Sequence, residues 1–185
     1  MARFSALLST ESISRSGDES LIMKALASVT LVALFAFSAV AQNTKLVPKE
    51  LKVLEGAAWT GTLTYLDYSS GKKTSIKSDL TISKLGERKW SFAFTYPDEP
   101  KANSKDDVLL SEDGRTFDGE TVVERTKLKN GILRIVTSRP GKDNDKPATI
   151  RHTYLFSKTE FSIRKDVKLD GGTEFFERNT YSWQR

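Results

Sequence analysis

The chain has no cysteine and only one histidine among its 185 residues. Without disulfides, a small disulfide-stapled scaffold is excluded, and the fold must be stable through packing alone. The missing cysteines also exclude a lipid-anchored lipoprotein and, together with the single histidine, the common structural zinc sets. A P-loop, a dinucleotide-binding glycine pattern, a Gly-x-Ser-x-Gly elbow and a His-Glu-x-x-His motif are absent as well. The sequence therefore predicts no enzymatic activity, no metal site and no cofactor.

A concentration of charge of one sign is also missing. The net charge of +5 lies wholly within residues 42–185, where basic and acidic residues are interspersed. A charge of this size is expected for solubility alone. The basic pair Lys72-Lys73 and the step at residues 127–129 lie beside predicted turns, and neither extends into the basic stripe that nucleic-acid binding requires. We therefore expect no nucleic-acid partner.

Long apolar runs are scarce, and the single clear one begins at an internal methionine. Met23 and Lys24 precede it, and residues 25–40 carry no charge. Small residues at Ala39 and Ala41 have the spacing that a signal peptidase cleaves. The run is shorter than the roughly 20 apolar residues of a membrane-spanning helix, although an uncleaved anchor is the alternative interpretation.

This run predicts export. We expect residues 23–41 to be a signal peptide that is cleaved between Ala41 and Gln42, which places the mature protein in the periplasm or outside the cell. No transmembrane segment is then expected in the mature protein. Residues 1–22 are polar and rich in serine, and they are interpreted as a non-native upstream extension or a disordered leader.

From residue 59 onward, alternating segments are separated by glycine, asparagine, aspartate or proline turns, which is typical of antiparallel sheets. Short connections favour a meander, which is stable when it closes and removes its edges. We therefore predict an all-β domain over 59–185, a single antiparallel up-and-down β-barrel of eight to ten strands. The alternative is a two-sheet β-sandwich. The segment 42–58 contains a candidate short helix over 47–54, with Leu51 and Leu54 on one face, which would cover one end of the barrel.

Several connections carry local signals. Asn130-Gly131 predicts a tight hairpin turn, and one strand is predicted over residues 116–126. Two polar, proline-containing segments, 97–105 and 139–147, are predicted to be exposed loops. These two loops would be the working parts if the barrel acted through its surface on a protein partner of the cell envelope.

The segment Gly56-Ala57-Ala58-Trp59-Thr60-Gly61 resembles the start of the first strand in lipocalin-like, or calycin, barrels. The longer stretch 59–72 resembles the opening of uncharacterised exported bacterial barrels. The resemblance implies a short N-terminal helix, a tryptophan that opens the first strand, and a basic residue of the last strand packed across that tryptophan. Trp59 would be the tryptophan, and Arg178 or Arg185 the basic residue. Here the glycine and the tryptophan are one residue further apart than in lipocalins, and the disulfide of that family is missing.

Aromatic residues gather on one face of several predicted strands. In a closed barrel this face should point inward, because aromatic rings bury a large apolar area. The rings then either fill the interior or line a cavity for one small ligand. Polar groups on the same faces would orient the polar head of such a ligand, or they would satisfy one another. The candidate ligand-binding residues are Trp90, Phe92, Phe94, Tyr96, His152, Tyr154, Phe156, Glu177, Asn179 and Tyr181. The candidate structural residues are Trp59, Gly61 and Trp183.

We expect an exported barrel that binds a small apolar or amphipathic ligand in its interior. The alternative is a filled structural or protein-interaction barrel of the cell envelope. A third interpretation is a haem-binding barrel or a small hydrolase that uses His152. The carboxylates of Asp118, Glu120 and Glu124 are expected to be solvated surface charges.

Overall fold

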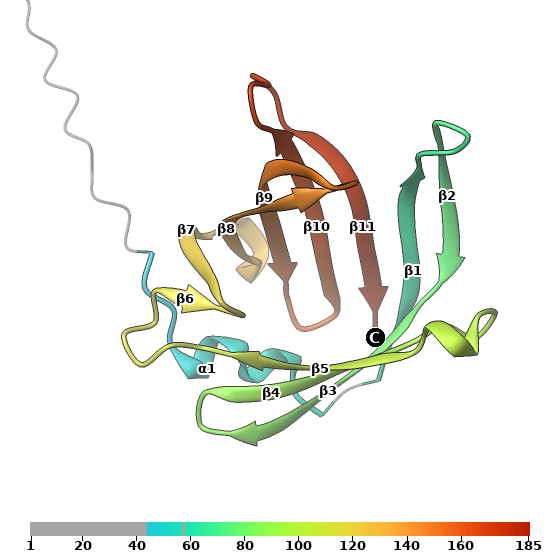
Figure 1. The fold of residues 1–185 in the computed structure, drawn as a ribbon. Helices are drawn as coiled ribbons and strands as arrows, with labels where there is room; N and C mark the ends of the chain where they lie inside the picture. Colours follow the sequence, from blue (N-terminus) through green and yellow to red (C-terminus); the bar gives the residue numbers. More distant parts are fainter. Residues whose placement is uncertain (1–43, 57) are drawn as a thin grey trace, which may run out of the picture. The chain divides into compact units, whose positions relative to one another are not determined.

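Eleven antiparallel strands form one continuous sheet in the computed structural model, which describes residues 44–56 and 58–185 (Figure 1). The spatial order is β5-β4-β3-β1-β11-β10-β9-β8-β7-β6, with β2 also paired to β1. The strands are β1 (Ala58–Asp67), β2 (Lys72–Lys77), β3 (Asp79–Gly86), β4 (Lys89–Thr95), β5 (Ser104–Leu109), β6 (Thr116–Phe117), β7 (Glu120–Lys127), β8 (Leu133–Asp143), β9 (Lys146–Phe156), β10 (Glu160–Leu169) and β11 (Phe176–Gln184). The predicted signal peptide, its cleavage site at Ala41 and Gln42, and residues 1–22 lie outside the described residues.

The two ends of this sheet meet, so that it forms a nearly closed barrel. The backbone N–H of Asp118 donates to the carbonyl of Leu109 at 2.8 Å, and that of Ser111 donates to the carbonyl of Thr116 at 2.9 Å. These bonds join β6, the last strand in the spatial order, to the end of β5, the first strand. Almost every strand pairs with its sequence neighbour, which confirms the predicted up-and-down barrel rather than the sandwich.

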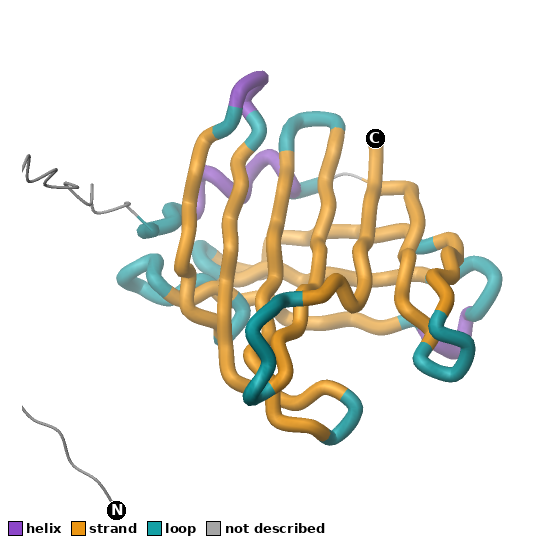
Figure 2. Tube along the Cα trace, turned by 90° about the horizontal axis from the view of Figure 1, so that it is seen from above, coloured by secondary structure: helices purple, strands orange, loops and turns teal. Residues whose placement is uncertain are grey.

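The barrel turns sharply at β1, whose single edge holds β2 along one half and β3 along the other. The chain between these two strands is tied back by the N–H of Ser78, which donates to the carbonyl of Gly61 at 2.9 Å. On the opposite edge, β1 approaches β11 so closely that a Cβ at Gly61 would lie 2.0 Å from the carbonyl oxygen of Ser182. Figure 2 shows the strands of one wall crossing behind those of the other.

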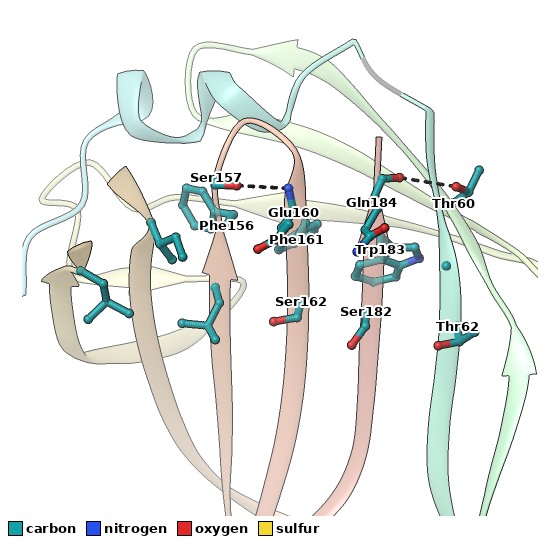
Figure 3. A pocket seen from close by; sticks show the side chains of 14 residues that line it. Thr60, Thr62, Phe156, Ser157, Glu160, Phe161, Ser162, Ser182, Trp183 and Gln184 are labelled. Carbon is teal, nitrogen blue, oxygen red and sulfur yellow. Dashed lines mark hydrogen bonds between the residues drawn. The ribbon is translucent and has the colours of Figure 1, made fainter. Parts of the chain in front are cut away.

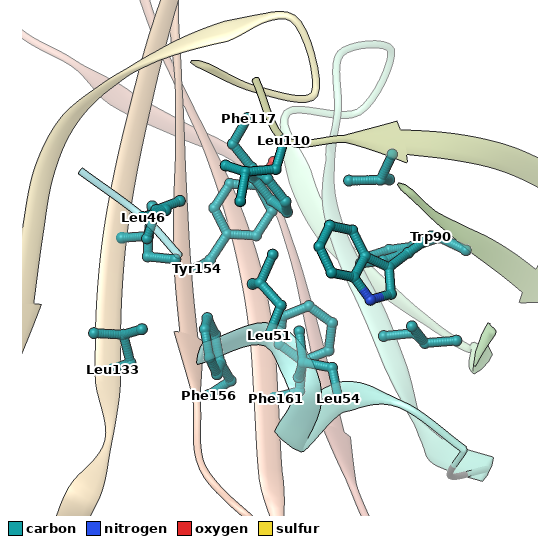
Figure 4. Packing of buried hydrophobic residues seen from close by; sticks show 14 of the residues in the cluster. Leu46, Leu51, Leu54, Trp90, Leu110, Phe117, Leu133, Tyr154, Phe156 and Phe161 are labelled. Carbon is teal, nitrogen blue, oxygen red and sulfur yellow. The ribbon is translucent and has the colours of Figure 1, made fainter. Parts of the chain in front are cut away.

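The N-terminal segment covers one end of the barrel. It forms the short helix α1 (Pro48–Leu51), continued by a 3₁₀ turn at Lys52–Leu54. Proline at the first helical position costs no hydrogen bond, since that N–H has no partner within the helix. Leu51 and Leu54 are each 2% exposed and pack into the main core, where Figure 4 shows them beside Phe156 and Phe161. The predicted short helix and its apolar face are confirmed.

Trp59 at the start of β1 is fully buried and is held from two sides. Its indole Nε1 donates to the carbonyl of Leu54 at 3.3 Å. The Arg185 guanidinium lies 4.4 Å from the centre of the indole ring and donates to the carbonyl of Val53 at 2.8 Å. This contact is the one that the lipocalin-like resemblance implies, and Arg185 rather than Arg178 makes it.

Cross-strand pairing arranges the inward side chains in layers. The layer nearest the helix is Leu133, Phe156, Phe161, Trp183 and Gly61. The next layer is Ile135, Tyr154, Ile163, Tyr181, Leu63 and Ile76. The third layer, which we call the polar row, is Thr137, His152, Lys165, Asn179 and Tyr65. The end of the barrel nearest the helix is therefore filled with aromatic rings. Toward the other end, the inward side chains become more polar.

Two local predictions about connections are wrong. The segment 116–126 is not one strand, because Asp118 and Gly119 have φ angles of 51° and 72° and fold it into the hairpin of β6 and β7. Two successive positive φ angles are typical of the tight turns that match the twist of a hairpin.

The segment 139–147 is not a loop. Strands β8 and β9 continue through it, paired as far as Asp143 with Lys146, and the turn consists only of Asn144 and Asp145, with φ angles of 47° and 62°. By contrast, the predicted exposed loop over 97–105 is confirmed for residues 97–103, and β5 begins directly after it. The predicted turn at Asn130-Gly131 is also confirmed, with φ angles of 64° and 76°.

Candidate ligand-binding site in the barrel interior

A cavity of about 210 Å³ lies inside the barrel, above the layer of packed rings. Apolar and polar side chains share its wall. The apolar and aromatic lining consists of Phe92, Phe94, Val108, Phe117, Tyr154, Ile163 and Tyr181. The remaining lining residues are Asp106, Asp118, His152, Lys165 and Asn179. The cavity thus has an apolar wall and a polar side that is formed mainly by the polar row.

A wider, more open space of about 420 Å³ adjoins this cavity, and Lys165 and Asn179 line both. Around it lie Leu63, Tyr65, Ile76, Tyr96, Glu99, Ala102, Asp143 and Arg178. Because the two hollows share lining residues from adjacent strands, they are neighbours, and the wider one lies nearer the end of the barrel opposite the helix.

The aromatic side chains of β4, and Tyr96 directly after it, lie partly in the filled core and partly along the two hollows. Phe92 and Phe94 line the cavity and Tyr96 lines its mouth. Trp90 instead belongs to the filled core, where it is 1% exposed and its Nε1 donates to Glu55 Oε1 at 2.9 Å. The inward direction predicted for this strand is therefore correct. Its rings fill the interior at one level and line a cavity at another.

Of the other predicted site residues, some line the cavity and one lies in the filled core. His152, Tyr154, Asn179 and Tyr181 line the cavity, whereas Phe156 lies in the filled layer, 3% exposed. The hydroxyls of Tyr181 and Tyr96 are hydrogen-bonded to each other at 2.8 Å. Burial and this hydrogen bond raise the pKa of Tyr181, so that the phenol stays neutral over the physiological range.

Glu177 does not join the site. The pairing of β10 with β11 shifts between Lys165 and Asp166, so that Arg178 is an extra residue between the partners Asn179 and Glu177. Such a bulge reverses the direction of the side chains beyond it. The Glu177 carboxylate therefore lies on the outer face, 3.2 Å from the Lys73 ammonium.

Arg178 occupies the inward position that alternation alone would give to Glu177. Its guanidinium lies 4.1 Å from the centre of the Tyr68 ring, and its Nε is 3.7 Å from Asp143 Oδ1. The phenol of Tyr68 in turn donates to the Asp143 carboxylate. Burial and this carboxylate raise the pKa of Tyr68 to about 12.

Behind the cavity wall lies a buried carboxylate that sequence reasoning placed at the surface. Glu120 is 4% exposed, so its prediction as a solvated charge is wrong. It accepts hydrogen bonds from Arg139 Nε at 2.8 Å, from the Thr137 hydroxyl and from His152 Nδ1 at 2.9 Å. Burial alone would raise the pKa of Glu120, but the hydrogen bonds from His152 and Thr137 outweigh burial and lower it. A buried carboxylate with several donors is expected to remain ionised.

Asp118 reaches the cavity from the turn between β6 and β7. The residue is exposed at the rim, yet its carboxyl group lines the cavity beside His152. Desolvation and repulsion from Glu120 raise the pKa of this carboxyl group. Burial likewise raises the pKa of Tyr154, which lies in the layer below.

Haem does not fit beside His152. The cavity of about 210 Å³ is smaller than the roughly 300–1,000 Å³ of sites that enclose drug-sized ligands, so it would not enclose a haem. Over residues 44–56 and 58–185, no three histidine or acidic side chains are grouped so that they could hold a metal ion.

A further hollow, of about 470 Å³, lies against β1, β9, β10 and β11 near the helix-covered end (Figure 3). Its polar rim includes Thr60, Thr62, Ser162 and Ser182. These residues alternate with the inward residues of the same strands, so their hydroxyls face outward. The Thr60 hydroxyl donates to the carbonyl of Gln184 at 3.5 Å.

In the part of the chain that the structure describes, no helix combines the length and apolar character needed to cross a bilayer. No protein-family model matches the chain, and no match was found among curated proteins.

Proposed function

We propose that the barrel binds a small, partly apolar molecule in its interior. The observation that carries this proposal is the cavity itself, which combines an apolar and aromatic wall with a polar row on one side. An apolar ligand body would gain about 25 cal/mol for each Å² of surface that it buries. The hydrogen-bonding groups of His152, Lys165 and Asn179 would select the polar head. Binding alone requires no chemistry on the ligand.

Two further features support a binding role. The filled layer and the helix close one end of the barrel, so that a ligand has a rigid floor. The wider hollow nearer the other end would supply the entry path, since it shares lining residues with the cavity. The lipocalin-like resemblance agrees with this arrangement, since barrels of that kind hold ligands in their interior.

The proposed setting is outside the cytoplasm. This proposal rests on the signal-peptide pattern over residues 23–41. N-terminal sequencing of protein isolated from its own host tests it: the expected first residue is Gln42, and a mature chain that retains residues 23–41 would contradict it.

The alternative, a barrel that acts through its surface on an envelope partner, is based on two predicted exposed loops, and one of them is not a loop. The segment 139–147 is a continuous hairpin, so of the two segments proposed to act only residues 97–103 form an exposed loop. No observation favours this alternative over interior binding.

The binding proposal is tested by filling the cavity from one strand. Val108 lines the cavity and is 4% exposed, whereas its neighbour Leu109 is 52% exposed on the outer face. The probe is N-phenyl-α-naphthylamine, an uncharged dye whose fluorescence rises in apolar sites. We expect saturable binding to the wild type and to Leu109→Phe, and a loss of at least tenfold in affinity for Val108→Phe. Equal binding by all three proteins would contradict an interior site.

A further inference from the structure

The imidazole of His152 is fixed on one side and free on the other. Its Nδ1 lies 2.9 and 3.0 Å from the two carboxylate oxygens of Glu120. Since an ionised carboxylate only accepts hydrogen bonds, this contact places the imidazole proton on Nδ1. Among the described residues, Nε2 has no hydrogen-bond partner, and the ring lines the cavity. Nε2 is therefore the ring atom that can exchange a proton with a bound molecule.

The carboxylate that orients His152 is itself held in place. Thr137 and Arg139, both on β8, donate to Glu120 from the neighbouring strand. With a side chain only 5% exposed, Glu120 cannot turn toward water without losing these bonds. The carboxylate would stabilise a positive charge on the ring, as acidic partners of catalytic histidines do.

A cation stands directly beside His152 in the polar row. Lys165 of β10 is the cross-strand partner of His152 and faces the same cavity. Inward cross-strand partners have Cβ atoms about 5 Å apart. The Lys165 ammonium has a loose ion pair with Asp143 at 3.7 Å, with 25% of its side chain exposed. It can therefore swing toward a ligand oxygen, and Asn179 on its other side supplies a second polar group.

We propose that His152 acts as a general base on the bound ligand, which is a small apolar carbonyl compound with a hydrogen on the carbon next to its carbonyl group. This proposal rests on the proposed interior binding function. In the step, Nε2 takes that hydrogen as a proton, the C–H electron pair becomes a carbon–carbon double bond, and the carbonyl π pair moves onto oxygen. Lys165 hydrogen-bonds this oxygen, where negative charge develops. Return of the proton to the same carbon or to a conjugated one regenerates neutral His152.

The surroundings of His152 fit this role. Its charged and titratable neighbours are Glu120, Asp118 and Tyr154, with Lys165 across the strand pair and Arg139 on the far side of Glu120. Asp106 of β5 lines the same cavity. The apolar wall excludes water from the ligand body, which strengthens the electrostatic interactions within the site.

The test uses α-tetralone, a bicyclic aromatic ketone with exchangeable protons next to its carbonyl. Binding is followed by the NMR shifts of the Val108 and Ile163 methyl groups, which line the cavity. Chemistry is followed by exchange of the ketone protons in deuterium oxide. We expect exchange that saturates with ketone and exceeds that of equimolar imidazole by about 10²-fold, since general-base catalysis contributes about 10² to 10⁴-fold.

Variants separate chemistry from binding. His152→Gln and Lys165→Met each remove a group that selects the polar head, so both should bind the ketone more weakly but still give saturable methyl shifts. At saturating ketone, His152→Gln should lose the excess exchange and Lys165→Met should lose at least tenfold. In Glu120→Gln the positioning carboxylate is gone, so the kcat of the exchange should fall while the KM and the binding shifts stay close to those of the wild type. Arg151→Gln, on the outer face of the same strand, should behave as the wild type.

The outcomes are distinct. Binding without exchange above the imidazole level would overturn the proton-transfer proposal and leave the binding function standing. Exchange that survives His152→Gln would also overturn it. If the ketone produces no shifts at the cavity methyl groups, both the binding of carbonyl compounds and the chemistry are contradicted.

Discussion

The buried carboxylate of Glu120 should stabilise the folded barrel as an ion, and Glu120→Gln tests this. Glutamine keeps the shape of the side chain but removes its charge and replaces one accepting oxygen by an NH₂ group. The Thr137 hydroxyl can rotate to accept from that group. Arg139, with 46% of its side chain exposed, can turn to water. The remaining loss is that of charge-assisted hydrogen bonds, each of which contributes about 1.5–3 kcal/mol.

We therefore expect Glu120→Gln to lower the free energy of unfolding at pH 7 by about 2 kcal/mol. This is less than the roughly 3–5 kcal/mol lost when a fully buried ion pair is broken. The effect should depend on pH. Burial opposes ionisation of Glu120, but the hydrogen bonds from His152 and Thr137 prevail and hold its pKa below the usual value of 4.5. A lowered pKa stabilises the folded state above that usual value, and this contribution is lost as pH falls through the lowered pKa.

The assay is urea unfolding followed by the fluorescence of the three buried tryptophans, Trp59, Trp90 and Trp183, at pH 7 and in acid. The difference between Glu120→Gln and the wild type should be present at pH 7 and shrink once the pH falls well below 4.5. Glu87→Gln, in an exposed turn, is the matched control and should change stability by less than about 0.5 kcal/mol. Equal stability of Glu120→Gln and wild type at pH 7, or a difference that persists unchanged in acid, would refute this reasoning.

Three further substitutions test the packing of the barrel. Leu51→Ala in the covering helix should cost about 2–5 kcal/mol of unfolding free energy by leaving a cavity, and a loss under 1 kcal/mol in urea unfolding would mean that the helix is not part of the core. Arg185→Gln removes the cation from the Trp59 ring and should cost about 1–2 kcal/mol, with a shift in tryptophan emission; an unchanged spectrum and stability would contradict that contact. Gly61→Ala places a methyl group where the Ser182 carbonyl lies, at 2.0 Å, so it should lower the melting temperature by several degrees through separation of β1 from β11, and an unchanged melting temperature would contradict the close approach.

Most of the fold could be predicted from the alternation of apolar and polar residues and from the residues at the turns. The period of two along residues 90–96 predicted the inward direction of Phe92 and Phe94, and Asn130-Gly131 predicted its turn, because both signals are local. The signals that were missed at two other turns were local too. Asp118-Gly119 and Asn144-Asp145 are pairs that adopt positive φ readily. The alternation around the first pair nevertheless predicts one continuous strand, and the prolines around the second predict a loop.

The site depends on information that is not local. The bulge in the pairing of β10 with β11 turns Arg178 inward and Glu177 outward. It depends on how these two strands pair, so the sequence of one strand alone does not reveal it. The burial of Glu120 likewise requires His152, which is distant in sequence and is brought beside it by the strand order. A carboxylate next to a turn resembles surface charge until those partners are in place.

Native mass spectrometry of the mature protein, isolated from its own host, tests the binding of a small molecule in the interior most directly. The account predicts a retained small molecule, with partly apolar chemistry, on the wild type and on Leu109→Phe, and its loss from Val108→Phe. A wild-type mass equal to that of the bare polypeptide, or a bound molecule that Val108→Phe retains, would contradict a ligand site inside the barrel.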